Sequence, residues 1–481
     1  MRADTRIVDD ETCVIVQSFL LPHAGSDLRT RKDEEGRSMT TSNMQEPAQV
    51  PAPTSPQPPT SMRRVAFASL IGTTIEYYDF YIFGTAAALV FPKVFFPALG
   101  TAAGVTASFA TLGVAFAARP LGSILFGHFG DKLGRKKTLI ATLLLMGLST
   151  LAVGLVPTTA VIGAAAPILI VLLRILQGLA VGGEWAGGVL LASENAPKKR
   201  RAFYATLPSF GGNLGIILSG ATFLGFHLSM SNETFLDWGW RLPFVSSIVL
   251  VAIGFWVRFK LDETAVFTHE KATAGVAKIP FKEAFKSQPR QILLMSGMIV
   301  GIYAISYISS TYMVTYGTVN LGLSRTTVLL VGIGNGFVGA AGMMLGAYFA
   351  DRYGRRRVVI VGLAFGMIWM LLLFPVVNLD TMSAFAAGIW IALFINGAAT
   401  APLGAFLSES FQTRYRYTAT GFCFNVSGIF GAAVPPIIAA PFIQAYGSLA
   451  FSILMAVIVA FSLFCVLNLR ESRNADLTNV S

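Results

Sequence analysis

The sequence is poor in charged residues. Asp, Glu, Lys and Arg make up 13% of its 481 residues, whereas 54% are hydrophobic. A soluble globular chain carries about 25% charged residues, and a domain of this size could not cover its surface in water with so few. This shortage excludes an ordinary soluble enzyme and indicates a chain whose main solvent is lipid.

Cysteine is also scarce, and the motifs of common enzymes are absent. Cys13, Cys423 and Cys465 lie far apart and form no CxxC pair, which argues against a disulfide framework or a metal site. We interpret the last two as small buried hydrophobes. The chain has no HExxH, GxSxG or P-loop pattern, so we expect no enzymatic activity, metal or cofactor.

Residues 1–62 differ in composition from everything that follows. They combine charges of both signs with the proline-rich run Pro47–Pro59, a composition typical of a disordered segment. The apolar piece at 13–21 is too short to cross a bilayer, and acidic residues precede it, which is unlike a signal peptide. We therefore predict a disordered tail.

The remainder is an all-α membrane protein by its hydrophobic pattern. From residue 65 to 469, apolar blocks alternate with short polar loops, and a spanning helix needs about 20 apolar residues. Short alternating segments typical of a strand-built barrel are absent. The blocks predict twelve spanning helices, at 65–91, 104–127, 137–156, 166–193, 203–227, 240–259, 291–317, 326–350, 357–377, 383–409, 417–443 and 447–469.

Basic residues concentrate in the loops on one side of these helices. Cytoplasmic loops of membrane proteins carry the excess of Lys and Arg, so both termini are predicted to be cytoplasmic, in a plasma or inner membrane. The formal net charge of +11 thus has a topological cause, and we expect no nucleic-acid partner. The basic loops contain Lys132, Arg135, Lys136, Lys137, Lys198, Lys199, Arg200, Arg201, Arg352, Arg355, Arg356, Arg357, Arg414 and Arg416.

The sequence repeats itself weakly. The segment GHFGDKLGRKK at 127–137 recurs as AYFADRYGRRR at 347–357, and a Glu precedes an Arg by seven residues in each half. Two six-helix halves joined by a long loop are typical of a parallel-repeat transporter. We predict halves at 63–259 and 291–469, a cytoplasmic loop at 260–290 and a tail at 470–481.

The matched loop residues predict a cytoplasmic gate. A glycine allows a tight reversal between two helices, and a carboxylate at a helix end can pair with basic neighbours or with a helix N-terminus. The alternative is that the arginines only fix topology. The predicted gating residues are Asp131, Gly134, Arg135, Glu194, Arg201, Asp351, Gly354, Arg355, Glu409 and Arg416.

The doubled loop resembles that of the major facilitator superfamily. The segments EYYDF at 76–80, RPLG at 119–122, and RILQG at 174–178 leading to GGEW at 182–185 are similar to its metabolite:proton symporter branch. The segments at 127–131, 202–204 and 238–243 look most like shikimate-transporting members. The resemblance implies the twelve-helix fold, proton coupling and a small-molecule substrate; related carriers move oxoglutarate, citrate, proline and betaine.

Ionisable residues inside the predicted helices are functional candidates, because burying a charge in a bilayer is costly. At about 1.5 Å per residue, Asp79, Arg119 and Arg174 fall in the central part of the bilayer. We expect a carboxylate to neutralise each arginine. If substrate draws the arginine away, burial favours protonation of the carboxylate. We predict Asp79 as the main proton carrier and Glu76 as the second; a purely structural ion pair is the alternative.

Polar and aromatic residues complete the predicted pocket, although such side chains also bridge packed helices. Glycines spaced along the fourth helix predict close helix packing. The predicted substrate-binding residues are Arg119, Arg174, Tyr77, Gln177, Asn213, Tyr303, Tyr307, Asn335 and Asn396, and the packing residues are Gly178, Gly182, Gly183 and Gly187.

These observations predict a monomeric symporter driven by the proton gradient that imports a small organic acid, such as shikimate, a related hydroxy acid or a dicarboxylate. Uptake of a zwitterionic osmolyte such as proline or betaine is an alternative, because tyrosines can cage a quaternary amine. Efflux by proton antiport is a third possibility. A channel is not expected, since no filter-like loop interrupts the helices.

Overall fold

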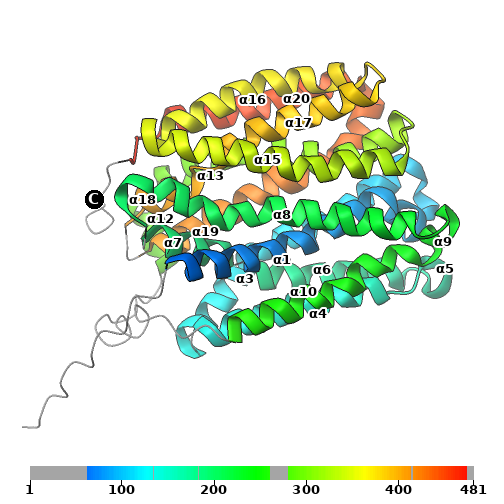
Figure 1. The fold of residues 1–481 in the computed structure, drawn as a ribbon, viewed down its shortest axis with the longest axis horizontal. Helices are drawn as coiled ribbons and strands as arrows, with labels where there is room; N and C mark the ends of the chain where they lie inside the picture. Colours follow the sequence, from blue (N-terminus) through cyan, green and yellow to red (C-terminus); the bar gives the residue numbers. More distant parts are fainter. Residues whose placement is uncertain are drawn as a thin grey trace, which may run out of the picture. The chain divides into compact units, whose positions relative to one another are not determined.

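The computed structural model describes residues 62–133, 135–182, 184–194, 196–259, 280–412 and 415–473, and within these residues every regular element is a helix (Figure 1). Several predicted features lie outside this part of the chain: the amino-terminal tail up to residue 61, the central loop from 260 to 279, Gly134, Gly183 and residues 474–481. The side chains of Asp131 and Arg135 also lie outside the described residues.

The amino-terminal half is built from six long helical passages. Short helices connect them: α2 (Phe91–Val94), α5 (Thr159–Ile162) and α9 (Asn232–Asp237). The fourth passage is divided into two helices near Gly182. The passages are α1 (Met62–Leu89), α3 (Gly100–Leu133), α4 (Arg135–Leu155), α6 (Ala165–Val181) with α7 (Glu184–Glu194), α8 (Arg201–Leu228) and α10 (Leu242–Phe259).

The carboxy-terminal half repeats this plan with more irregular helices. π-helical turns interrupt its first and fifth passages, at Ile308–Tyr312, Tyr316–Asn320 and Gly428–Ala433. The described part of the central loop forms α12 (Pro280–Ser287). The passages are α13 (Pro289–Tyr307) with α14 (Met313–Thr315), α15 (Arg325–Tyr353), α16 (Arg355–Val377), α17 (Met382–Thr400) with α18 (Leu403–Ser410), α19 (Arg416–Ser427) and α20 (Val434–Leu467).

The number of passages agrees with the hydrophobic pattern. Among the described residues, nine helical stretches are long and apolar enough to cross a membrane by length and composition. One of them, Arg416–Leu467, contains two predicted helices, because Gly447 adopts a φ of 83° inside α20. Helices α1 and α4 occupy the first and third predicted positions. The prediction of twelve helices in two halves is confirmed.

The outward faces of these helices are apolar. Large hydrophobic side chains that a soluble protein would bury are more than half exposed here, including Leu148, Ile168, Phe337, Phe365 and Val457. Exposed apolar surface of this extent is stable in contact with lipid chains and marks a membrane-embedded surface.

Helices from the two halves pack directly on each other, with α8 against α15 and α3 against α19 and α20. Within the amino-terminal half, α3 and α6 approach closely, because Gly178 leaves room for the backbone of Ala115 and Gly182 for that of Arg119. These two contacts bring the polar residues of α3 and α6 into one buried layer.

Candidate binding cavity and coupling cluster

Four ionisable side chains form a buried cluster inside the amino-terminal half. Glu76 and Asp79 come from α1, Arg119 from α3 and Arg174 from α6, and each is at most 3% exposed. Two acids and two bases give a neutral cluster when all are ionised. Their burial places these residues inside the bundle rather than against lipid.

Asp79 and Arg174 are joined through two other side chains and not by direct contact. Arg174 Nη1 donates to Gln177 Oε1 at 2.7 Å. Gln177 Nε2 donates to Thr150 Oγ1 at 2.6 Å, and Thr150 Oγ1 donates to Asp79 Oδ2 at 2.9 Å. A direct ion pair between Asp79 and Arg174 is absent from the pairs formed by the described residues, which corrects our expectation of direct neutralisation.

Arg119 is the partner of the other carboxylate. Its Nη2 lies 3.8 Å from Glu76 Oε1. Its guanidinium also stacks on aromatic rings, 4.3 Å from the Phe80 centroid and 4.4 Å from that of Phe116. Arg174 lies 4.8 Å from the Phe80 centroid, so both guanidinium groups share one ring. Such cation–π contacts partly compensate the desolvation of a buried arginine.

A small cavity of about 80 Å³ lies between the two halves. Aromatic rings and neutral hydrogen-bonding groups line it, and six predicted substrate-binding residues are among them: Tyr77, Asn213, Tyr303, Tyr307, Asn335 and Asn396. The other three, Arg119, Arg174 and Gln177, belong to the charged cluster and do not line the cavity.

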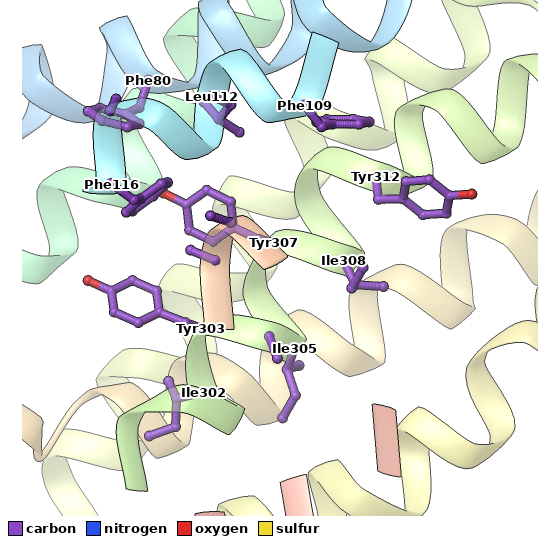
Figure 2. Packing of buried hydrophobic residues seen from close by; sticks show 14 of the residues in the cluster. Phe80, Phe109, Leu112, Phe116, Ile302, Tyr303, Ile305, Tyr307, Ile308 and Tyr312 are labelled. Carbon is purple, nitrogen blue, oxygen red and sulfur yellow. The ribbon is translucent and has the colours of Figure 1, made fainter. Parts of the chain in front are cut away.

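Phe116 separates the cavity from the charged cluster. Its ring stacks under Arg119 and packs edge-on against Tyr307, with centroids 5.4 Å apart, and against Tyr303 at 6.5 Å. Figure 2 shows the ring of Phe116 between that of Phe80 and those of Tyr307 and Tyr303. Phe116 therefore contacts both the neutral cavity lining and the charged cluster.

One end of the structure carries the basic segments 198–200 and 352–357, and we call it the basic end. Helices α7, α12, α18 and α19 gather there (Figure 1). The two halves contact each other at this end: Arg201 pairs with Glu409 at 3.1 Å, and Arg416 with Glu194 at 3.3 Å. Trp185 also stacks on Phe424, with centroids 3.5 Å apart. The cavity is therefore closed toward the basic end.

Three of the predicted gating residues of the second half, Asp351, Arg355 and Glu409, form one network. Arg355 contacts Glu409 through Nε and Nη2, both at 3.1 Å, and lies 3.5 Å from Asp351. Gly354 has a φ of 111°, a conformation that favours glycine. Asp351 accepts hydrogen bonds from the backbone of Ala202 and Phe203 at the start of α8.

The opposite end of the cavity is closed as well. Arg325 at the start of α15 donates to Asn232 of α9 at 2.6 Å. Thr315 of α14 donates to the carbonyl of Ala88 on α1 at 3.4 Å. Contacts between the halves at both ends describe an occluded conformation.

Sequence reasoning missed several residues of these sites. Nothing in the sequence distinguishes Thr150 from other helical threonines, and its contacts with Asp79 and Gln177 depend on the approach of α4 to α1 and α6. Glu471 accepts from the backbone of Arg355 and Arg356, and Ser472 donates to Glu409 at 2.7 Å. Glu471 and Ser472 stand one residue after the last predicted apolar block, and nothing in that segment indicates a contact with Glu409 or with α16.

The predicted packing glycines divide into two kinds. A Cβ at Gly178 would overlap the carbonyl of Ala115, and one at Gly182 would overlap that of Arg119. At Gly187 the nearest atom, on Tyr417, is 3.5 Å from such a Cβ, which is ordinary contact. Close helix approach thus depends on the first two and not on Gly187.

Known proteins similar to this chain are membrane transporters. The inner membrane metabolite transport protein YhjE of Escherichia coli K12 is 40% identical over 431 residues, covering 87% of this chain and 97% of that protein. The shikimate transporter of the same organism is 38% identical over 390 residues, covering 79% and 88%. A proline/betaine transporter of Salmonella typhimurium is 31% identical over 428 residues, covering 86% and 85%.

The fold comparison and the family comparison agree. A D-xylose–proton symporter crystal structure matches with a TM-score of 0.70 at 18% identity, covering 87% of this chain and all of that one. The Major Facilitator Superfamily family model matches residues 69–435 and 318–479. Since these relatives are carriers, the chain is a multi-pass transporter and not an enzyme. The chain therefore belongs to the major facilitator superfamily.

Proposed function

We propose that this protein is a proton-coupled symporter that imports a small organic acid, such as shikimate, a related hydroxy acid or a dicarboxylate, by alternating access. In this proposal the protein acts as a monomer in the plasma or inner membrane, with the basic end and both termini in the cytoplasm. The proton gradient is its energy source.

The unused donors of the two arginines are the observation that carries this proposal. Arg174 Nε and Nη2 and Arg119 Nε are buried and have no hydrogen-bond partner among the described residues. Adjacent Nε and Nη2 groups form the fork that binds a carboxylate in a bidentate way. A buried donor without an acceptor costs about 1–3 kcal/mol, so a carboxylate that reached Arg174 would relieve this cost.

Proton coupling follows from the charge of the cluster. With both carboxylates ionised the cluster is neutral and offers no net attraction to an anion. Protonation of Asp79 leaves one positive charge in excess, which favours entry of a carboxylate in a medium of low dielectric constant. Release of the substrate leaves the excess positive charge uncompensated again, which favours loss of the proton from Asp79. Anion and proton therefore favour each other's binding.

The cavity lining suits the remainder of a hydroxylated acid. The Tyr303 hydroxyl and the Oδ1 atoms of Asn335 and Asn396 are buried without a partner in the part of the chain that the structure describes. Amides and hydroxyls can each donate to and accept from a substrate hydroxyl. At about 80 Å³ the cavity is smaller than the roughly 300–1,000 Å³ of ligand sites, so the proposal requires expansion in the loaded state.

Uptake of a quaternary-ammonium osmolyte is the second candidate. Tyr77 and Tyr81 stack with centroids 6.2 Å apart, and both line the cavity with Tyr303 and Tyr307. Aromatic faces attract such cations. A trimethylammonium group has no donor for the asparagine carbonyls, which is why we favour the hydroxy acid. Efflux by antiport uses the same fold and differs only in the direction of coupling.

Transport by purified protein in proteoliposomes tests the proposal. Shikimate, dicarboxylates, proline and betaine would be compared by counterflow, in which a carrier exchanges labelled for unlabelled substrate. An inward proton gradient should then drive accumulation of an acid above equilibrium. Exchange of betaine alone would favour the second candidate, and accumulation driven only by an outward proton gradient would favour antiport.

A further inference from the structure

Thr150 occupies the centre of the link between Asp79 and Arg174. It lies on α4, is fully buried, and its hydroxyl has three neighbours at hydrogen-bond distance. These are Asp79 Oδ2 at 2.9 Å, Gln177 Nε2 at 2.6 Å and its own helix carbonyl, Met146 O, at 3.0 Å. Gln177 can only donate through Nε2, and Met146 O can only accept. The Asp79 oxygen is the one neighbour that can do either.

A threonine hydroxyl has one hydrogen to donate and two lone pairs. When Asp79 is ionised, the hydroxyl donates to Oδ2 and accepts from Gln177. When Asp79 carries a proton on Oδ2, the hydroxyl accepts from Asp79 and from Gln177 and turns its own hydrogen to Met146 O. Both states keep the Thr150 hydroxyl and Oδ2 fully hydrogen-bonded, and neither requires a side chain to leave its position.

The separation of Asp79 from Arg174 also affects whether Asp79 can take up a proton. The charged groups that act on Asp79 are Arg174 on α6 and Glu76 on its own helix, and Arg119 on α3 is paired with Glu76. Direct contact with Arg174 would hold Asp79 in the ionised form, because breaking a buried ion pair leaves an uncompensated charge. Gln177 holds Arg174 in place while Thr150 separates it from Asp79.

The second carboxylate oxygen points to the same conclusion independently. Asp79 Oδ1 is buried and has no hydrogen-bond partner among the residues described. An ionised carboxylate that served only structure would be expected to have both oxygens satisfied. This arrangement leaves one oxygen of Asp79 open to protonation and gives the other a partner that suits both protonation states.

We propose that Thr150 is the positioning residue for proton coupling, which allows Asp79 to bind and release a proton while Gln177 keeps Arg174 fixed. Binding forms an O–H bond at Asp79 with a proton from the side of the membrane to which the cluster is open. Release breaks that bond and delivers the proton to the opposite side. The inference rests on the proposed function, in which Asp79 is the proton carrier, and it adds the residue that makes the exchange reversible.

The first test needs no substrate. Infrared difference spectra of the purified full-length protein, recorded from acid to neutral pH, detect the carbonyl band of a protonated carboxylic acid. The band that disappears in Asp79→Asn belongs to Asp79. Thr150→Val removes a hydrogen bond from both forms of Asp79, and the bond to the ionised carboxylate is the stronger one, so the midpoint of this band should move to higher pH by about one unit. Thr150→Ser keeps the hydroxyl, so the titration curve of its Asp79 band should match that of the wild type.

Ser149→Ala is the matched control, because Ser149 is buried on the same helix and its hydroxyl donates to its own helix, at Leu145 O, with no second partner in the described part of the chain. Thr150→Ala replaces Thr150→Val if the latter fails to give folded protein, as judged by thermal melting. An unchanged midpoint in folded Thr150→Val or Thr150→Ala protein would overturn the inference, as would the absence of any band assignable to Asp79.

Uptake in proteoliposomes is the second test, with shikimate as the first probe. The pH dependence of gradient-driven uptake should shift in Thr150→Val in the same direction as the infrared midpoint, whereas Ser149→Ala should keep the wild-type profile. A shifted band in a protein that transports none of the acids would support the role of Thr150 and refute the proposed function. Normal uptake with an unshifted profile would refute only the role of Thr150.

Discussion

Arg201 and Glu409 form a buried ion pair that joins the two halves at the basic end. Arg201 Nη1 lies 3.1 Å from Glu409 Oε1, and the Glu409 side chain is fully buried. Glu409 also accepts hydrogen bonds from Arg355 and from Ser472. One carboxylate thus contacts arginines from both halves, and it is the most deeply buried of the acidic residues that join them at this end.

Replacement of Glu409 by Gln should weaken this closure strongly. Loss of one member of a buried ion pair costs about 3–5 kcal/mol, because the remaining charge is left uncompensated. Thermal melts of the purified protein should show a large fall in stability. Glu194→Gln is the matched control: Glu194 pairs with Arg416 but is 42% exposed, and an exposed pair contributes only about 0–1 kcal/mol. Equal losses in the two variants would contradict this interpretation.

Replacement of Asp79 by Asn should separate exchange from accumulation. The amide has the shape of the protonated carboxyl but cannot release a proton, so gradient-driven accumulation should fall at least about tenfold. Counterflow, which needs no net proton movement, should continue. Uptake assays at several external pH values provide the measurement, with Glu76→Gln compared in parallel. Accumulation equal to wild type at every pH would remove Asp79 from the mechanism.

Replacement of Arg174 by Lys should raise the KM for a carboxylate substrate. Lysine retains the charge but lacks the planar fork of Nε and Nη2. The loss of one charge-assisted hydrogen bond of about 1.5–3 kcal/mol corresponds to a KM increase of tenfold or more. Arg325→Lys, which alters an arginine at the opposite end of the cavity, should leave KM unchanged. A similar KM in the two variants would argue against carboxylate binding at Arg174.

Gly178→Ala should destabilise the protein, whereas Gly187→Ala should be tolerated. The added methyl group at Gly178 overlaps the backbone of Ala115, and backbone cannot move aside without separating α3 from α6. Overpacking of this kind costs about 1–3 kcal/mol. At Gly187 the methyl group meets the Tyr417 ring at 3.5 Å. The difference in thermal stability between the two alanine variants checks the prediction, and the reverse order would refute it.

Glu471→Ala should loosen the start of α16. The residue before this helix, Gly354, has no side chain, and Glu471 instead accepts from the backbone of Arg355 at 2.8 Å and Arg356 at 3.2 Å. Loss of an N-terminal cap costs about 0.5–2 kcal/mol. Glu471→Gln keeps a carbonyl acceptor and should lose less. Chemical denaturation of the two variants measures the difference.

The sequence was sufficient to predict the helices because a bilayer imposes a simple rule on composition. Most predicted and observed helix ends lie within a few residues of each other, as at 203–227 against Arg201–Leu228 and 357–377 against Arg355–Val377, but the second helix, predicted at 104–127, extends over Gly100–Leu133. The buried positions of Asp79 and Arg174 followed from the cost of a charge in lipid. Cys423 and Cys465 are buried free thiols, as predicted.

The partners of these residues could not be predicted in the same way. Hydrophobic periodicity shows how far along a helix a residue lies, but the rotation of α4 relative to α1 and α6 decides whether Thr150 meets Asp79 and Gln177. Nor does local sequence show that Phe116 separates the arginines from the cavity, since ring stacking depends on the packing of α3 against α13. These contacts arise from tertiary structure alone.

The N-terminus of helix α8 is capped by a carboxylate from the other half. The residue before it, Arg200, provides no side-chain cap, and Asp351 of the other half accepts from Ala202 at 2.9 Å and Phe203 at 3.1 Å. Whenever the halves separate at this end, the backbone amides of Ala202 and Phe203 lose their acceptor and become exposed to water. Hydrogen–deuterium exchange at Ala202 and Phe203 would therefore record, without any label or engineered residue, how often the transporter opens on that side.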